Sequence, residues 1–145
     1  MKKSRVFIII SIMITLFIFS NSLKNSMESS ATSGRFLSFI NSILEIFSLS
    51  ITHAFLRKMA HFCEFLCLGV SLSLSGLFSL KGLKLTTKYI LLSGLLISAT
   101  DELLQFIPVG RSPMIKDVFI DFFGILTGYM VIFIIYILNE KRHLK

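Results

Sequence analysis

The sequence lacks the patterns by which many soluble enzymes are recognised. It has no glycine-rich phosphate loop, no G-x-S-x-G and no H-E-x-x-H, so no familiar catalytic motif is complete. Its only two cysteines, Cys63 and Cys67, lie four residues apart in an apolar run, which excludes a disulfide framework and a cysteine-rich zinc site. Internal repeats and low-complexity tails are also absent. Function must therefore be inferred from the apolar and charged residues.

Apolar residues dominate the composition. They make up 54% of the 145 residues, and the mean hydropathy of +0.81 is too high for an ordinary soluble domain. A chain of this length forms one domain at most, and a water-soluble domain of that size could not bury so many apolar side chains. We therefore expect the lipid bilayer to be their solvent.

Four apolar segments approach the roughly 20 residues that a membrane-spanning helix needs. They cover residues 5–23, 55–80, 89–107 and 118–138. The first segment resembles a signal peptide, but no clean cleavage pattern follows it directly, so we expect a retained signal-anchor helix. The predicted fold class is an all-α, polytopic membrane protein, in which residues 1–145 form a single domain with four transmembrane helices.

The basic residues indicate the orientation of the chain. The net charge of +7 would suggest a nucleic-acid partner in a soluble protein, but here the basic residues flank apolar runs and no nucleic acid is expected. With four spans, one side of the membrane carries a large basic excess that only Glu140 offsets. By the positive-inside rule this side is the cytoplasm, so we expect a multi-pass protein of the cell membrane with both termini cytoplasmic. The residues are Lys2, Lys3, Arg5, Lys81, Lys84, Lys88, Lys141, Arg142 and Lys145.

The first outer loop contains a candidate amphipathic helix over residues 35–48. Its apolar residues recur at helical spacing, and polar residues fall mainly on the opposite face. This pattern predicts a helix that lies on the outer leaflet, and the alternative is a lid packed over the bundle. The apolar positions are Phe36, Ile40, Ile43 and Phe47.

Ionisable residues within the predicted spans are not scattered. Arg57, His61 and Glu64 share one face of the second span because they are spaced i, i+4 and i+7. At about 1.5 Å per helical residue, polar groups from all four spans reach the outer third of a hydrocarbon core about 30 Å thick. We call this set the polar cluster. It comprises Asn21, Arg57, Lys58, His61, Glu64, Asp101, Glu102, Gln105, Arg111, Asp117 and Asp121.

Several of these residues lie in motifs that resemble a known family. The stretches RKMAHFCEF at 57–65, DELLQF at 101–106 and GRS at 110–112 are similar to those of the VanZ-like family, as are Phe19–Ser22 and Asp117-Val118 with Asp121 and Gly124. The resemblance covers nearly the whole chain and implies a small bacterial membrane protein. The founding member of the family is associated with resistance to teicoplanin, a lipoglycopeptide antibiotic. No reaction follows from the resemblance, and neither does resistance conferred by this chain.

The first functional interpretation of the polar cluster is a binding site for a cell-envelope amphiphile. Arginines at its rim suit bidentate contact with phosphate or pyrophosphate, while an apolar tail would run between the helices. Membrane lipids, a lipid-linked cell-wall intermediate and a lipoglycopeptide are the partners that fit. All residues of the polar cluster are candidates for ligand binding.

The main alternative is a membrane enzyme that acts on a lipid phosphate or head group. Candidate catalytic residues are His61, Glu64, Asp101, Glu102 and Asp121. Hard oxygen ligands also suit a divalent cation that could assist phosphoryl transfer, for which the candidates are Glu64, Asp117 and Asp121. A purely structural ion-pair network is the third alternative, and a transporter would need an oligomer, since no inverted repeat is visible. The sequence does not define the oligomeric state.

Overall fold

The computed structural model describes residues 2–24, 26–79, 83–111 and 113–143. Over these ranges the chain is helical and contains no strand, which confirms the all-α class. Five α-helices and one 3-10 turn follow in the order α1 (Lys2–Ser22), α2 (Ser26–Leu44), η1 (Glu45–Phe47), α3 (His53–Leu77), α4 (Leu83–Leu104) and α5 (Ile115–His143).

Three of these helices are long and apolar enough to cross a membrane, which identifies a membrane protein. They are Lys2–Ser22, His53–Leu77 and Ile115–Glu140. The helix α4 falls short because Lys88 and the pair Asp101 and Glu102 bracket an apolar stretch of only about 12 residues, fewer than the roughly 20 that a span needs. The predicted third span over residues 89–107 therefore remains a prediction, and the helix itself ends three residues earlier, at Leu104.

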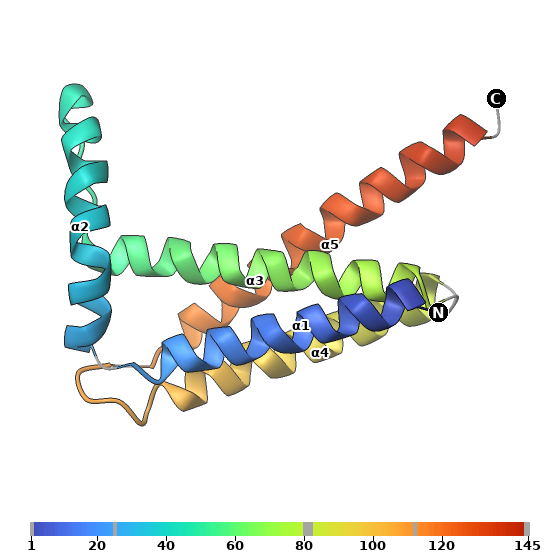
Figure 1. Ribbon diagram of the computed structural model, residues 1–145, viewed down its shortest axis with the longest axis horizontal. Helices are drawn as coiled ribbons and strands as arrows, with labels where there is room; N and C mark the ends of the chain where they lie inside the picture. Colours follow the sequence, from blue (N-terminus) through green and yellow to red (C-terminus); the bar gives the residue numbers. More distant parts are fainter. Residues whose placement is uncertain (1, 25, 80–82, 112, 144–145) are drawn as a thin grey trace.

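The helices reverse direction along one bundle, with α3 at its centre (Figure 1). Helix α3 packs against α1, α4 and α5, and α4 also packs against α1 and α5. The start of α1 and the end of α5 lie toward the same end of the bundle. The α1–α2 and α4–α5 connections lie at the opposite end, which is where the polar cluster falls.

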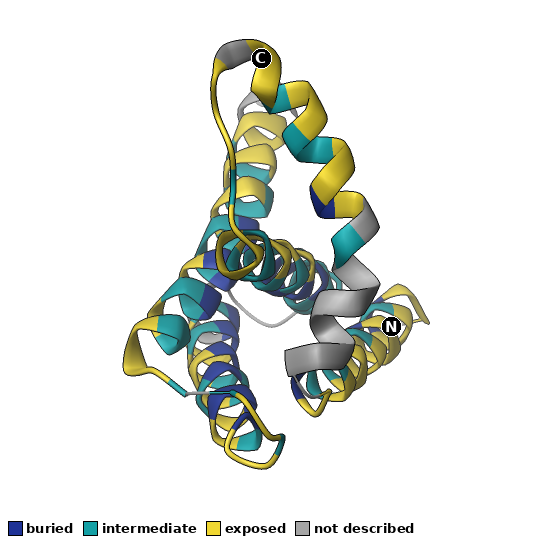
Figure 2. Ribbon diagram, turned by 90° about the vertical axis from the view of Figure 1, so that its left-hand side faces the viewer, coloured by how far each residue is buried: buried dark blue, intermediate teal, exposed yellow. Residues whose placement is uncertain are grey.

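The interior of the bundle is small, and most large apolar side chains point outward. A core of Ile18, Phe65, Leu68, Ile90 and Ile125 is almost fully buried. By contrast, exposed apolar residues cover the outer faces of the helices, as the yellow ribbon in Figure 2 shows. An apolar outer surface of this extent is stable when lipid covers it.

Glycines allow α3 and α5 to approach closely. A Cβ atom added to Gly124 would lie 2.7 Å from the carbonyl oxygen of Phe62, and one added to Gly69 would lie 2.8 Å from the Cα of Ile125. These distances are too short for any other residue without a shift of backbone. The G-x-x-x-G pair Gly124 and Gly128 therefore lies at the helix contact, where such motifs commonly occur.

Helix α2 includes most of the segment for which an amphipathic helix was predicted. It begins earlier than residue 35 and gives way to η1 at Glu45, after which Ser48 adopts a left-handed conformation with φ of 56°. Figure 1 shows α2 standing across the left-hand end of the bundle. The side chain of Asn41 hydrogen-bonds both backbone groups of Ile51, at 3.1 and 2.8 Å, and so fixes the connection to α3. Leu37 is buried while Phe36 and Ile43 are exposed, and the placement of α2 on a leaflet remains a prediction.

Candidate functional site

The polar cluster is assembled from the ends of four helices and one loop. Helix α3 begins at His53 because the side chain of Thr52 accepts a hydrogen bond from the backbone N–H of Phe55, at 3.2 Å, and so caps the helix. This start places Arg57, Lys58, His61 and Glu64 in the first four turns. Asn21 comes from the last turn of α1, Asp101 and Glu102 from the last turn of α4 with Gln105 just after it, Asp117 and Asp121 from the first turns of α5, and Arg111 from the α4–α5 loop.

Several acidic groups of the cluster are withdrawn from the surface. Asp101 is 0% exposed, Asp121 is 2% exposed and Glu102 is 5% exposed. An ionised carboxylate in such a place is unfavourable unless hydrogen bonds or cations compensate it. The partners of these groups therefore decide what the cluster can do.

Asn21 connects α1 to α3 and to the loop. Its Nδ2 donates to Glu64 Oε1 at 3.0 Å, and its Oδ1 accepts from Lys24 Nζ at 2.8 Å. Its backbone carbonyl accepts from Arg111 Nη2 at 3.0 Å. One polar residue at the end of the first helix thus holds an acidic and a basic member of the cluster.

Two further contacts bring α5 and the loop onto the bundle. Lys58 Nζ and Asp117 Oδ1 form an ion pair at 2.5 Å, which links α3 to α5. The backbone N–H of Met114 donates to Glu102 Oε1. These contacts are structural, since each fixes one element against another.

The centre of the cluster is a group of three residues from three different helices. One ligand atom from each of His61, Asp101 and Asp121 lies within 4.8 Å of the others. His61 Nδ1 is 3.8 Å from Asp101 Oδ2 and 4.0 Å from Glu64 Oε2, too far for a hydrogen bond. A small cavity of about 10 Å³ adjoins the group and is lined by Arg57, Lys58, His61, Gln105, Asp117, Ile120 and Asp121.

Some buried polar atoms of the cluster have no hydrogen-bond partner within the described residues. They are His61 Nδ1, Glu64 Oε2, Asp101 Oδ1, Glu102 Oε2, and the Nε and Nη1 of Arg111. Burial and the nearby Arg57 lower the pKa of Arg111, which lies outside the helices. A guanidinium nevertheless remains charged at neutral pH. Buried donors and acceptors without partners are suited to a ligand that supplies both hydrogen-bond acceptors and hydrogen-bond donors.

The structure places every predicted site residue at one end of the bundle. The three candidate metal ligands have different contacts: Asp117 pairs with Lys58, Glu64 accepts from Asn21, and a carboxylate oxygen of Asp121 lies near His61 and Asp101. The sequence reasoning did not assign a site role to Lys24 or to the backbone of Met114. Lys24 could have been found, since it lies one turn after Asn21, but a backbone donor in a loop leaves no signal in residue type.

A bundle of apolar helices with buried charged residues at one end defines a small helical membrane protein with a polar site. The chain belongs to the VanZ-like family, because the family model VanZ/LLP1 matches residues 5–136, a range that includes the whole polar cluster. No curated protein and no solved structure matches the chain.

Proposed function

We propose that this protein binds an anionic amphiphile of the cell envelope, with the head group at the polar cluster. The observation that carries this proposal is that part of the buried guanidinium of Arg111 has no hydrogen-bond acceptor in the described part of the chain. Its Nη2 contacts Asn21, while its Nε and Nη1 are buried and have no acceptor among the described residues. Each of these two N–H groups can still donate a charge-assisted hydrogen bond to an oxygen of an anionic head group.

Arg57 strengthens the attraction for an anion. It lines the cavity beside His61 and Asp121, and it forms no hydrogen bond or ion pair with any residue that the structure describes. Lys58 is less available, because it already neutralises Asp117. The two arginines are therefore the residues on which head-group binding depends in this proposal.

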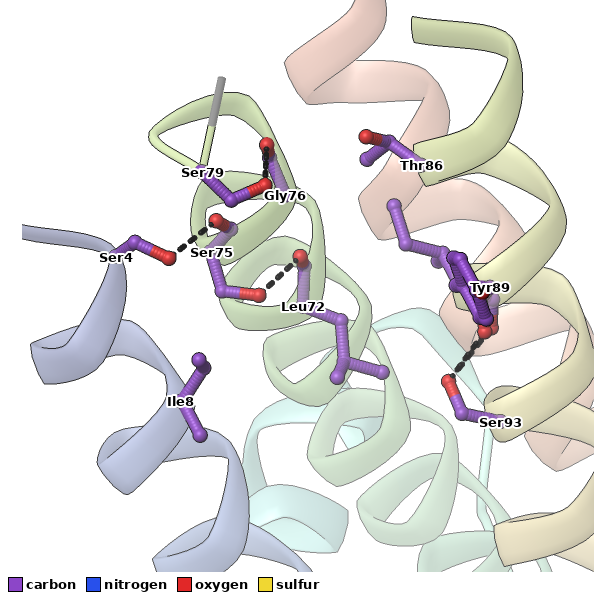
Figure 3. A pocket seen from close by; sticks show the side chains of 10 residues that line it. Ser4, Ile8, Leu72, Ser75, Gly76, Ser79, Thr86, Tyr89 and Ser93 are labelled. Carbon is purple, nitrogen blue, oxygen red and sulfur yellow. Dashed lines mark hydrogen bonds between the residues drawn. The ribbon is translucent and has the colours of Figure 1, made fainter. Parts of the chain in front are cut away.

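A groove between α1, α3 and α4 offers a place for the tail. One part has a volume of about 300 Å³ and is lined mainly by apolar side chains, among them Ile8, Leu16, Leu72 and Ile97. A second part of about 250 Å³ shares Ile8 and Leu72 with the first and continues toward the start of α1. Figure 3 shows this second part, with Ser4 and Ile8 on one side and Thr86, Tyr89 and Ser93 on the other.

The groove and the polar cluster are arranged end to end. Ile97 lines the groove, and Asp101 follows it one helical turn later on the same face of α4. An amphiphile with its phosphate at Arg111 would thus lie with its chain along the groove. A lipid-linked cell-wall intermediate has this chemistry, and a lipoglycopeptide of the teicoplanin type shares its charged head and acyl tail.

The proposal includes the orientation of the chain. Four spans with both termini in the cytoplasm place the polar cluster in the outer leaflet, and α2 then lies as an amphipathic helix at the outer surface. The start of α1 and the end of α5 lie toward the same end of the bundle in Figure 1, which supports this arrangement. The basic excess at the ends of the chain also supports it.

The second candidate function is catalysis on the head group of such a lipid. It is favoured by the approach of His61 to the carboxylates of Asp101 and Asp121. An imidazole near carboxylates can transfer protons, and the same atoms can hold a metal that polarises a phosphoryl oxygen. Glu64 and Glu102 remain further candidates for an acid or a base in this alternative.

One experiment separates binding from catalysis. Purified protein is incubated with a pool of envelope lipids, and both the bound fraction and the pool are followed by mass spectrometry. We expect an anionic lipid to co-purify unchanged from the wild type and to be lost with Arg111→Ala. The variant Lys116→Ala is the matched control, because it removes a positive charge from an exposed position nearby, and it should retain the lipid. A new lipid product that disappears with Asp121→Asn would instead favour the enzyme.

A further inference from the structure

The group formed by His61, Asp101 and Asp121 has the composition of a metal site. Each of α3, α4 and α5 contributes one residue, and one ligand atom of each lies within 4.8 Å of the others. A metal with bonds of about 2.0–2.2 Å holds two ligand atoms no more than about 4.4 Å apart. Three ligand atoms around one such metal lie about 3.3–3.8 Å apart, so side-chain movements of up to about 1 Å would bring the three atoms to bonding distance of a common centre.

The hydrogen bonding of these residues also supports a metal site. Asp101 is 0% exposed, and its Oδ2 accepts from Gln105 Nε2 at 3.2 Å. Its Oδ1 has no partner in the described chain, and neither does the Nδ1 of His61. A fully buried carboxylate oxygen without a donor is rare in proteins, and a metal ion is one of the partners that satisfies it. Gln105 then has the role of orienting the carboxylate.

The charges around the group are also unbalanced. Asp101 and Asp121 bring two negative charges into a buried place, and Glu64 and Glu102 lie close by. The neighbouring lysines have other partners, since Lys58 pairs with Asp117 and Lys24 donates to Asn21. Arg57 and Arg111 are then the nearby cations, and they face four carboxylates. The cavity of about 10 Å³ beside His61 and Asp121 has room for a single atom or water molecule.

We propose that His61, Asp101 and Asp121 bind one divalent transition-metal ion of the Mn²⁺ or Zn²⁺ type. An imidazole nitrogen favours such ions over Ca²⁺ and Mg²⁺, which prefer oxygen ligands alone. Three protein ligands leave a coordination position open for water or for an oxygen of a ligand. The proposal does not depend on lipid binding, and it differs from the set Glu64, Asp117 and Asp121 that the sequence suggested.

The test uses the full-length protein in detergent, treated with chelator and free of added lipid. Protein is equilibrated with Mn²⁺, Zn²⁺ or Ca²⁺ and desalted, and bound metal is measured by plasma mass spectrometry alongside the thermal unfolding temperature. We expect about one Mn²⁺ or Zn²⁺ per chain with a higher unfolding temperature, because an ion that binds only the folded state stabilises it. We expect little retained Ca²⁺.

The variants identify the ligands. His61→Gln, Asp101→Asn and Asp121→Asn should each weaken metal binding by at least about tenfold, whereas Glu64→Gln and Asp117→Asn should bind like the wild type. Glu45→Gln removes an exposed carboxylate outside the cluster and serves as the matched control. Helix content by circular dichroism must match the wild type for each variant, so that metal loss is not a loss of fold.

Several outcomes would overturn the proposal. One is a wild-type protein that retains no ion and shows the same unfolding temperature with and without metal. Another is unchanged binding in Asp101→Asn or Asp121→Asn, and a third is loss of the ion in Asp117→Asn. Because the readout is bound metal and no lipid is added, these outcomes are distinguishable from whether Arg111→Ala loses a co-purifying amphiphile.

Discussion

At the scale of single residues, the carboxylates of the polar cluster fall into two kinds. Asp117 has a cation at 2.5 Å, since Lys58 reaches it across the α3–α5 contact. Asp101 is more deeply buried, yet the amide of Gln105 that donates to its side chain is neutral. Asp117 stabilises the folded state through its ion pair, whereas an ionised Asp101 lowers the free energy of unfolding because its charge is buried. A residue kept in the second state is suited to bind a ligand.

This difference predicts opposite effects of two similar substitutions in metal-free detergent. Asp117→Asn should destabilise the protein by about 1 kcal/mol, because Lys58 loses the charge of its partner in a partly exposed pair. Asp101→Asn should leave the unfolding temperature unchanged or raise it, because an amide avoids the desolvation of a charge. Thermal unfolding of both variants at neutral pH checks the prediction.

The control is a double-mutant cycle on the ion pair. Adding Lys58→Gln to Asp117→Asn should recover part of the lost stability, since the unpaired ammonium is removed. If Asp101→Asn destabilises the protein as much as Asp117→Asn does, the cluster is a structural ion-pair network and not a ligand site.

At the scale of helices, glycine contacts determine which residues meet. Gly124 packs on the backbone at Phe62, and Gly69 packs on Ile125, so both the distance and the rotation of α5 against α3 are fixed there. Asp121 lies three residues before Gly124, and His61 lies one residue before Phe62. The same contact that packs the two helices therefore carries Asp121 to His61.

This contact can be tested with one matched pair of substitutions. Gly124→Ala places a methyl group 2.7 Å from the carbonyl oxygen of Phe62, and overpacking of this kind should destabilise the protein by about 1–3 kcal/mol. Gly34→Ala in α2 meets nothing within 4 Å, so it should be neutral or stabilise its helix by up to about 1 kcal/mol. Thermal unfolding in detergent measures both, and equal effects would contradict the assigned contact.

At the scale of the whole molecule, the sequence predicted the class and the location of the site better than its pairings. Apolar run length predicted the helices, and the i, i+4 spacing of Arg57 and His61 put them on one face because helical periodicity is local. The rotation of one helix against another is not local, so the sequence could not show that Asp117 meets Lys58 while Asp121 meets His61.

The start of α2 and the membrane span at α4 also could not be predicted reliably from local sequence patterns. Helix α2 begins at Ser26 in a serine-rich segment that has almost no apolar periodicity, so residues 35–48 alone gave a helical signal. Helix α4 is assigned to the bundle by its contacts with α1, α3 and α5. Its lysine and carboxylates weaken the hydropathy signal that identifies a span.

The orientation of the molecule is the last prediction, and it determines on which side of the membrane the polar cluster works. In a background without Cys63 and Cys67, single cysteines are placed at four exposed positions: Ser50, Val109, Lys2 and Asn139. A membrane-impermeant maleimide added to intact cells should label Ser50→Cys and Val109→Cys, because both lie at the end of the bundle that carries the polar cluster. It should label Lys2→Cys and Asn139→Cys only after the cells are opened. Labelling of Lys2→Cys in intact cells would reverse the orientation, and labelling of Ser50→Cys but not Val109→Cys would show that α4 does not span. The basic excess near the chain termini favours labelling of Ser50→Cys and Val109→Cys alone in intact cells, since lysine and arginine near span ends are retained in the cytoplasm.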